Sequence, residues 1–273
     1  MKLTTLHSSR YPVTLQCTYP GSEETAPFAA LLKLLSEYGF SGIELNLPDL
    51  SAISVNTLQK LLDSSKLQLT YIATGAYAKV RGFSLSSPDP ILRRKSIEGC
   101  KENIRYAGQF HCGIIIGLFK NQPSDKKENA EHYLTDSLIQ LSDFAEKFNV
   151  QILLEATNRY ESCVANALAD TFQIVCQTKS PVISILPDTF HMNIEERDPF
   201  QALRVYRGHY PNVHLSDNNR FFPGMGCIPF EHYIQILDDL QYHGTLGIEG
   251  AILQNTKTDL EIAVRRLSPL LCD

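Results

Sequence analysis

The chain has 273 residues, of which 43% are hydrophobic and 20% are charged, a composition typical of a water-soluble globular protein. A net charge of −5 without a long basic run argues against a nucleic-acid or membrane partner and favours a small molecule. Seven scattered cysteines, none spaced as CxxC, argue against a disulfide framework or a zinc knuckle. The first residues lack the apolar core of a signal peptide, so we expect a cytoplasmic protein.

Short apolar segments alternate with helical patterns along the whole chain. Such segments, apolar on both faces and rich in β-branched residues, are typical of strands buried in a parallel sheet. Eight strands are expected, at residues 13–17, 42–47, 69–75, 113–119, 151–156, 182–188, 212–217 and 245–250.

Apolar residues at intervals of three and four mark the helices expected between these strands. In the segment 26–38 these residues are Phe28, Leu31, Leu32 and Leu35. Gly39 follows as a C-terminal stop, and the segment 229–241 repeats the same spacing. A capping box formed by Thr258 and Glu261 is expected to open the last helix.

Strict alternation of eight strands with about eight helices indicates the fold. It favours a single (β/α)8 TIM barrel that spans residues 1–273 as one domain, because no linker-like or low-complexity stretch divides the chain. A doubly wound open sheet is the second choice, and it is weakened because no GxGxxG follows any expected strand.

Residues that can ligate a metal lie in or at the ends of four successive expected strands. They are Glu155, Asp188, His214 and Glu249. They follow one another at intervals of 33, 26 and 35 residues, close to the ~31-residue period of a barrel of eight units in ~250 residues. Because barrel chemistry lies on the loops after the carboxyl ends of the strands, we expect all four at one mouth.

Three carboxylates that converge cannot all stay ionised without a cation, so the pattern indicates a divalent metal. Three oxygen donors and one imidazole suit manganese, magnesium, cobalt or ferrous iron better than a structural zinc. Any one acid could instead cap a helix or pair with a lysine, an alternative that weakens for all four together. His191, three residues after Asp188, is expected beside the metal as a donor to bound substrate, with a purely structural histidine as the alternative.

Two further polar residues follow the same strands. Glu161 comes six residues after Glu155, and Arg220 comes six residues after His214, ahead of a glycine-rich turn. We expect Arg220 to hold a substrate oxygen, although it could also neutralise the acids of the mouth. Glu161 could equally bond backbone amides in its own loop.

The stretches LLEATNRYE, PDTFHMNIEE, VHLSDNNR…PGMG and GIEG resemble the sugar isomerase/epimerase superfamily of xylose isomerase-like barrels. The likeness is greatest to ketose 3-epimerases of the tagatose and psicose type. The resemblance implies one divalent metal ion held by Glu155, Asp188, His214 and Glu249, with manganese preferred and magnesium, cobalt, ferrous iron or zinc as alternatives. It makes Glu155 and Glu249 the acid/base pair and gives substrate contacts to His191, Arg220 and Glu161. A sugar substrate and a homo-oligomer, dimer or tetramer, are implied as well.

Three other functions use similar parts. An isomerase that moves the carbonyl, of the hydroxypyruvate or aldose–ketose type, is barely separable by sequence. A metallonuclease of the endonuclease IV type needs many histidines and a basic face, and is disfavoured by the net charge of −5. A barrel that binds a sugar or metal without turnover is disfavoured because both Glu155 and Glu249 are present.

The chain departs from the family in having no tryptophan and in placing Lys120 after the fourth strand. Lys120 is expected on the mouth side together with Lys79 and Arg81. We expect these three cations to be solvated loop residues that balance the acidic mouth, and the substrate to be an unphosphorylated ketose. The alternative is a sugar phosphate whose phosphate the cations hold.

Overall fold

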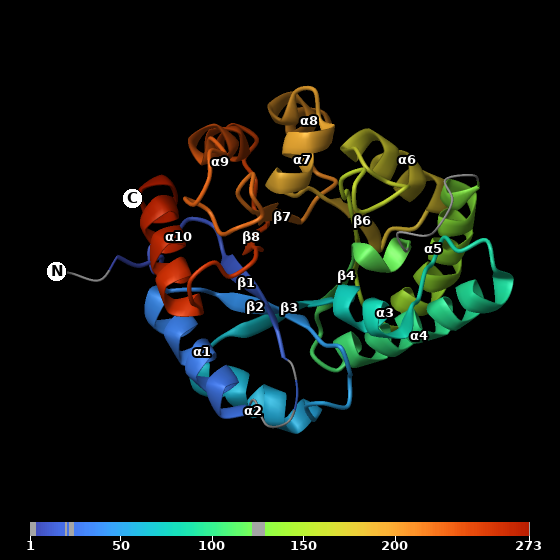
Figure 1. Cartoon of the computed structure of the whole chain (residues 1–273), viewed down its shortest axis with the longest axis horizontal. Helices are drawn as coiled ribbons and strands as arrows, with labels where there is room; N and C mark the ends of the chain where they lie inside the picture. Colours follow the sequence, from blue (N-terminus) through green and yellow to red (C-terminus); the bar gives the residue numbers. More distant parts are fainter. Residues whose placement is uncertain (1–3, 20, 22–24, 122–128, 273) are drawn as a thin grey trace.

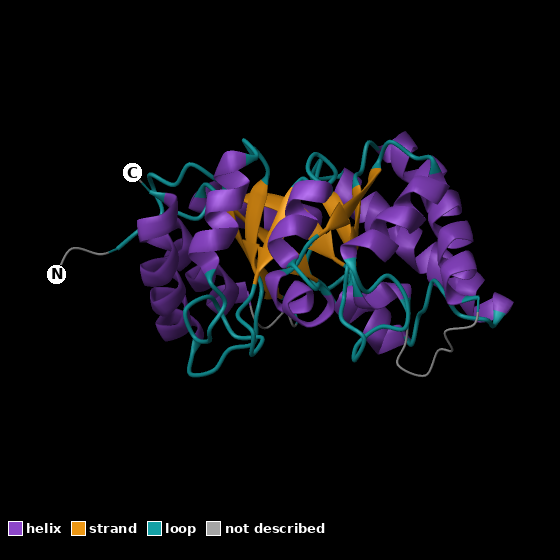
Figure 2. Cartoon of the chain, turned by 90° about the horizontal axis from the view of Figure 1, so that it is seen from above, coloured by secondary structure: helices purple, strands orange, loops and turns teal. Residues whose placement is uncertain are grey.

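The computed structural model describes residues 4–19, 21, 25–121 and 129–272. Eight parallel strands form one sheet at the centre of the molecule, and helices surround it (Figures 1 and 2). The strands are β1 (Val13–Thr18), β2 (Gly42–Asn46), β3 (Gln68–Ala73), β4 (Gly113–Ile116), β5 (Ile152–Glu155), β6 (Ile183–Leu186), β7 (Asn212–Leu215) and β8 (Thr245–Ile248).

Helices connect successive strands and cover the outside of the sheet (Figure 2). They are α1 (Thr25–Tyr38), α2 (Val55–Ser65), α3 (Gly75–Arg81), α4 (Pro90–Gly108), the 3₁₀ helix η2 (Leu118–Lys120), α5 (Ala130–Phe148), α6 (Leu168–Thr178), α7 (Thr189–Glu195), α8 (Pro199–Val205), α9 (Phe230–Asp239) and α10 (Thr256–Leu271). Within the described residues, no helix has both the length and the apolar character needed to cross a membrane.

The sheet curls into a nearly closed barrel. Its strand order is β6-β5-β4-β3-β2-β1-β8-β7, so β1 pairs with both β2 and β8. The two remaining edges, β6 and β7, meet at the mouth, where Asp188 pairs with His214 in parallel and the His214 amide donates to the carbonyl of Pro187 at 2.9 Å. The predicted (β/α)8 barrel is therefore confirmed.

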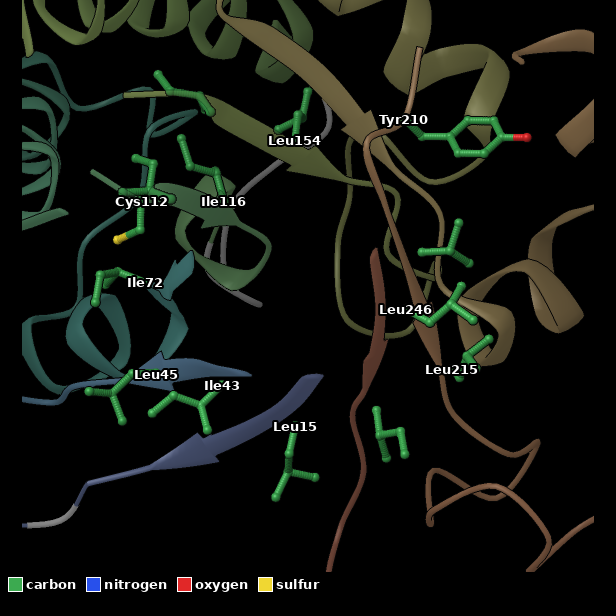
Figure 3. Close-up of a cluster of buried hydrophobic side chains, with 14 of the residues drawn as sticks. Leu15, Ile43, Leu45, Ile72, Cys112, Ile116, Leu154, Tyr210, Leu215 and Leu246 are labelled. Atoms are coloured by element: carbon green, nitrogen blue, oxygen red, sulfur yellow. The ribbon is translucent and has the colours of Figure 1, made fainter. Parts of the chain in front are cut away.

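The core has two parts, one on each face of the barrel wall. Outward-facing residues of the strands, including Leu15, Ile43, Leu45 and Leu215, pack against the helices (Figure 3). A separate buried cluster consists of Tyr71, Ile115, Leu153 and Leu186. Leu153 and Leu186 precede Glu155 and Asp188 by two residues and so face the same side of the sheet, the barrel interior. An apolar layer therefore underlies the polar mouth.

Seven of the eight expected strands extend one to three residues past the observed ends, and the expected helices differ from the structure as well. The fourth strand ends at Ile116 rather than at residue 119, because η2 begins at Leu118. Ten α-helices occur in the described residues instead of about eight, because two of the connections each contain two helices, α3 with α4 and α7 with α8. The capping box at Thr258 is wrong: α10 begins at Thr256, and the Asn255 side chain accepts a hydrogen bond from the Thr258 amide. Gly39 ends α1 as predicted, with φ of 84°.

Candidate metal centre

The four expected ligands meet at the mouth of the barrel. Glu155 ends β5, Asp188 follows β6, His214 lies in β7 and Glu249 follows β8. Each offers one ligand atom, and these atoms all lie within 4.8 Å of one another. From His214 Nδ1 the distances are 3.6 Å to Glu155 Oε1, 3.9 Å to Asp188 Oδ2 and 2.6 Å to Glu249 Oε2.

Three buried atoms of this cluster form no hydrogen bond among the described residues, although two of them, His214 Nδ1 and Glu249 Oε2, are close enough for an ion pair once the ring is protonated. The three atoms are Glu155 Oε1, His214 Nδ1 and Glu249 Oε2. Buried polar atoms are nearly always paired in folded proteins, so three such atoms in one small space call for a ligand. Carboxylate oxygens with an imidazole nitrogen are a donor set that suits a divalent cation. The cluster therefore fits the expected metal.

The electrostatics of the cluster without metal point the same way. Burial disfavours a charged imidazole, but the Glu44 and Glu249 carboxylates outweigh it and raise the pKa of His214 well above its ordinary value. Burial also disfavours an ionised Glu249, but Arg220 and His214 outweigh it and lower the pKa of that carboxyl. A proton on His214 thus balances the acids, and a bound metal would replace that proton.

Glu44 orients the His214 ring and was missed by the sequence analysis. His214 Nε2 lies 2.8 Å from Glu44 Oε2, and both side chains are fully buried. The other Glu44 oxygen accepts hydrogen bonds from Asn212 Nδ2 at 2.7 Å and Thr14 Oγ1 at 3.2 Å. A Cβ at Gly247 would lie 2.6 Å from Glu44 Oε1, so only glycine leaves room for this contact. A carboxylate behind a metal-ligating histidine fixes its tautomer and raises its basicity.

Arg220 bridges two of the acidic ligands. Its guanidinium donates to Asp188 Oδ2 and pairs with Glu249 Oε1, each at 2.6 Å, and lies over the ring of Phe190. The other Asp188 oxygen caps α7, accepting from the amides of Phe190 and His191. Arg220 therefore does neutralise the acids of the mouth, the alternative left open by its sequence.

Asp217 shapes the loop that carries Arg220, residues 217–228, and was also missed. Its buried carboxylate accepts hydrogen bonds from the backbone amides of Asn218, Gly224, Gly226 and Ile228. Four such bonds satisfy an otherwise costly buried charge and give the glycine-rich turn a fixed course.

His191 and Glu161 are linked through Asn158. His191 Nδ1 accepts from the Asn158 backbone amide at 3.2 Å and lies 2.8 Å from Asn158 Nδ2, which also donates to Glu161 Oε1 at 2.9 Å. Because Nδ1 accepts, Nε2 carries the proton of a neutral ring. His191 Nε2 lies 3.8 Å from Glu155 Oε1, so this N–H faces the metal ligands as a hydrogen-bond donor.

The two acids that follow His191 hold the β5 loop, residues 156–167. Glu195 accepts from the backbone and the guanidinium of Arg159, and Glu196 accepts from the Leu168 amide just beyond the loop. Neither is among the residues that could hold a metal in the described chain. They tie the β5 loop to α7.

The expectation for the three cations near the mouth is wrong for two of them. Lys120 is fully buried, and its Nζ donates to the backbone carbonyls of Glu155 at 2.6 Å and Ala165 at 3.0 Å. Burial lowers the pKa of Lys120 to about 7. Arg81 is bound by two backbone carbonyl groups. Only Lys79 of the three is an exposed side chain.

A cavity of about 340 Å³ opens beside Glu249 and Arg220. Its wall also includes Gln16, Cys17, Phe222 and Ile252. A carboxylate and a guanidinium in a cavity with both apolar and polar walls are typical of a small-molecule site.

The sequence matches the family model of the xylose isomerase-like TIM barrel over residues 32–267. The chain belongs to this family. It is 27% identical over 256 residues to a D-psicose 3-epimerase of Enterocloster bolteae, covering 91% of this chain and 85% of that protein. It is 34% identical to the 3-dehydro-D-guloside 4-epimerase of Escherichia coli over 119 residues, 44% of this chain and 45% of that protein. The crystal structure of D-psicose 3-epimerase with D-tagatose from Clostridium cellulolyticum superposes with a TM-score of 0.80 at 22% identity, covering 95% and 99% of the two chains.

Proposed function

We propose that this chain is a divalent-metal-dependent epimerase that inverts the configuration of C3 in a ketose. One observation carries the proposal: two carboxylates, Glu155 and Glu249, reach one buried centre from different strands with an imidazole and a third carboxylate between them. The relatives named D-psicose 3-epimerase support the same activity. Residues 1–273 are proposed to form one domain.

The metal would be held by Glu155, Asp188, His214 and Glu249, whose ligand atoms lie together at one centre. When bound, a divalent cation would polarise the substrate carbonyl and make the neighbouring C–H acidic enough for a carboxylate to remove its proton. Manganese is the proposed native metal, because oxygen donors dominate the set.

The protein groups would act on the two faces of the substrate. One of Glu155 and Glu249 takes the proton from C3, and the other returns a proton to the opposite face, which inverts that carbon. His191 donates its Nε2–H to a substrate oxygen. Arg220, paired with Asp188 and Glu249, orients these carboxylates and holds a substrate oxygen at the edge of the cavity. Glu161 contacts substrate hydroxyls or acts through Asn158.

A second candidate is epimerisation at C4 of a 3-keto sugar glycoside. The segment of 34% identity to the E. coli 4-epimerase favours it. The chemistry is equivalent, because the inverted carbon again lies next to a ketone. The two candidates differ in the position of the ketone, C2 against C3, and in whether the sugar carries a substituent at the anomeric carbon, so the substrates themselves separate them.

The proposed substrate is unphosphorylated, since Lys120 and Arg81 are engaged with backbone carbonyl groups. We also propose a cytoplasmic protein that assembles as a dimer or tetramer, which the family resemblance supports.

The test is incubation of the manganese-loaded protein in D2O with free ketoses, ketose phosphates and 3-keto glycosides, followed by NMR. Deuterium at C3 of a free ketose, together with its epimer, is the expected result. Deuterium at C1 would indicate a carbonyl-shift isomerase, and deuterium at C4 of the glycoside would favour the second candidate. No exchange with any substrate would refute the proposal. Glu249→Gln, loaded with the same metal, is the matched control and should form the epimer at least ~10²-fold more slowly.

A further inference from the structure

Lys120 has a fully buried amino group that contacts the end of β5, the strand that carries Glu155. The side chain is fully buried, yet its two hydrogen bonds in the described structure go to backbone carbonyls of Glu155 and Ala165 and not to a carboxylate. A buried amino group is costly unless its donors are satisfied, so breaking either hydrogen bond would be unfavourable. The two bonds therefore hold both carbonyl groups against η2.

The β4–η2 segment contacts Glu155 on two sides. Lys120 binds the Glu155 carbonyl, while a Cβ at Gly117 would lie 2.1 Å from Glu155 Oε2, so the glycine leaves space for the carboxylate. The segment is itself fixed, because the amides of Leu85 and Ser86 donate to the carbonyls of Phe119 and Lys120. The β4–η2 segment therefore limits movement of Glu155, one of the four expected metal ligands.

Lys120 also joins the two ends of the β5 loop. The Ala165 carbonyl accepts both the Lys120 ammonium and the Thr157 amide, and Ala165 has a left-handed backbone with φ of 55°, unfavourable for a residue other than glycine. A second contact from the same segment, Ser162 Oγ to Asn121 Oδ1 at 2.5 Å, fixes the middle of the loop.

This loop carries the groups that set the geometry of His191. Asn158 binds Nδ1 of the ring through both its amide and its side chain, and it also holds Glu161. The position of the loop therefore sets which nitrogen of His191 bears the proton and where that proton points. Lys120 connects this loop to the backbone of the carboxylate that faces the same ring.

We propose that Lys120 is a positioning residue for the reaction. Its amino group holds the β5 loop against the end of β5, so that the Glu155 carboxylate and the His191 donor are correctly placed before substrate binds. The proposal rests on the proposed function for its kinetic consequence. A displacement of ~1 Å at a reacting group can cost ~10²-fold in rate, so loss of the clamp should lower kcat.

The experiment compares wild type with Lys120→Met, which matches the aliphatic part of the lysine side chain and removes the amino group with its charge and donors. Hydrogen–deuterium exchange and steady-state kinetics are measured on each metal-loaded protein. In Lys120→Met, peptides covering 156–167 should exchange at least ~10-fold faster than in wild type, whereas peptides of β7 and α9 should be unchanged. Turnover kcat should fall by ~10-fold or more while KM stays close to wild type. Lys79→Met, the same change at an exposed mouth-side lysine, is the matched control and should behave as wild type.

Lys120→Arg, which keeps the charge and N–H donors, should recover part of the protection of the β5 loop and part of kcat. Unchanged exchange of the loop in a folded Lys120→Met protein would overturn the proposal. So would faster exchange throughout the molecule, or failure of both variants to fold, since either assigns Lys120 to general stability. If the wild type turns over no substrate, the proposed function fails, and the loop exchange still decides whether the clamp exists.

Discussion

Replacing Glu44 by glutamine should weaken metal binding although Glu44 is not a ligand. Donors surround its carboxylate: His214 Nε2 at one oxygen, and Asn212 Nδ2 and Thr14 Oγ1 at the other. An amide has one acceptor oxygen and one NH2 group, so one side must place a donor against a donor. If the NH2 faces His214, the ring proton moves to Nδ1, the atom that would bind the metal. We expect the Mn²⁺ dissociation constant to rise ~10–100-fold, the usual effect of losing such a partner. That range corresponds to ~1.4–2.7 kcal/mol.

Calorimetric titration of Mn²⁺ into the metal-free protein near neutral pH measures this constant. Glu231→Gln is the control, because it makes the same chemical change at a half-exposed position on α9. Thermal unfolding of both variants without metal separates weaker binding from loss of folded protein. A Glu44→Gln protein that is folded and binds Mn²⁺ as tightly as wild type would refute the argument.

Four other outcomes follow from the structure. Glu249→Gln should lower kcat by ~10²-fold or more at saturating metal, because an amide cannot carry the proton; near-normal kcat would exclude the two-carboxylate mechanism. EDTA should abolish activity, and Mn²⁺ or Co²⁺ should restore it better than Ca²⁺, which prefers a larger cage; activity in protein shown to be metal-free would contradict this. His191→Ala should impair kcat/KM and leave Mn²⁺ affinity unchanged in titrations. Arg266 holds the pKa of Glu231 at about 2, so the stabilisation by this pair exists above the ordinary pKa of 4.5 and is lost as pH falls towards 2. Because the pair is partly exposed, Glu231→Gln should cost at most ~0.5 kcal/mol in urea unfolding at neutral pH and nothing near pH 2.

The barrel and the ligand cluster could be predicted because both depend on chain order. Parallel strands in a barrel share one carboxyl edge, so Glu155, Asp188 and Glu249, each at the end of an apolar strand, had to meet. His214 was predicted to lie beside them because it belongs to the seventh strand, between the strands that carry Asp188 and Glu249. None of these inferences needed an exact register between strands.

Glu44 and Lys120 could not be assigned a role in the same way. Glu44 is one acid in an apolar strand. It reaches His214 only because its side chain points into the barrel, and β1 and β8 lie between its strand β2 and β7. Lys120 stands at a loop-like position in the sequence, and its burial depends on η2 and on a loop that begins 36 residues later. Both residues act through contacts with segments far away in the sequence, and no local sequence pattern predicts such contacts.

The ordered loop around Asp217 has a consequence for the thermodynamics of binding. Four backbone amides of residues 217–228 are already bonded to one carboxylate, so this segment has little conformational entropy left to lose when a substrate arrives. Association with this face of the site should then resemble docking to a rigid surface, with the heat-capacity change set by the area that the sugar itself covers and not by folding of the protein around it.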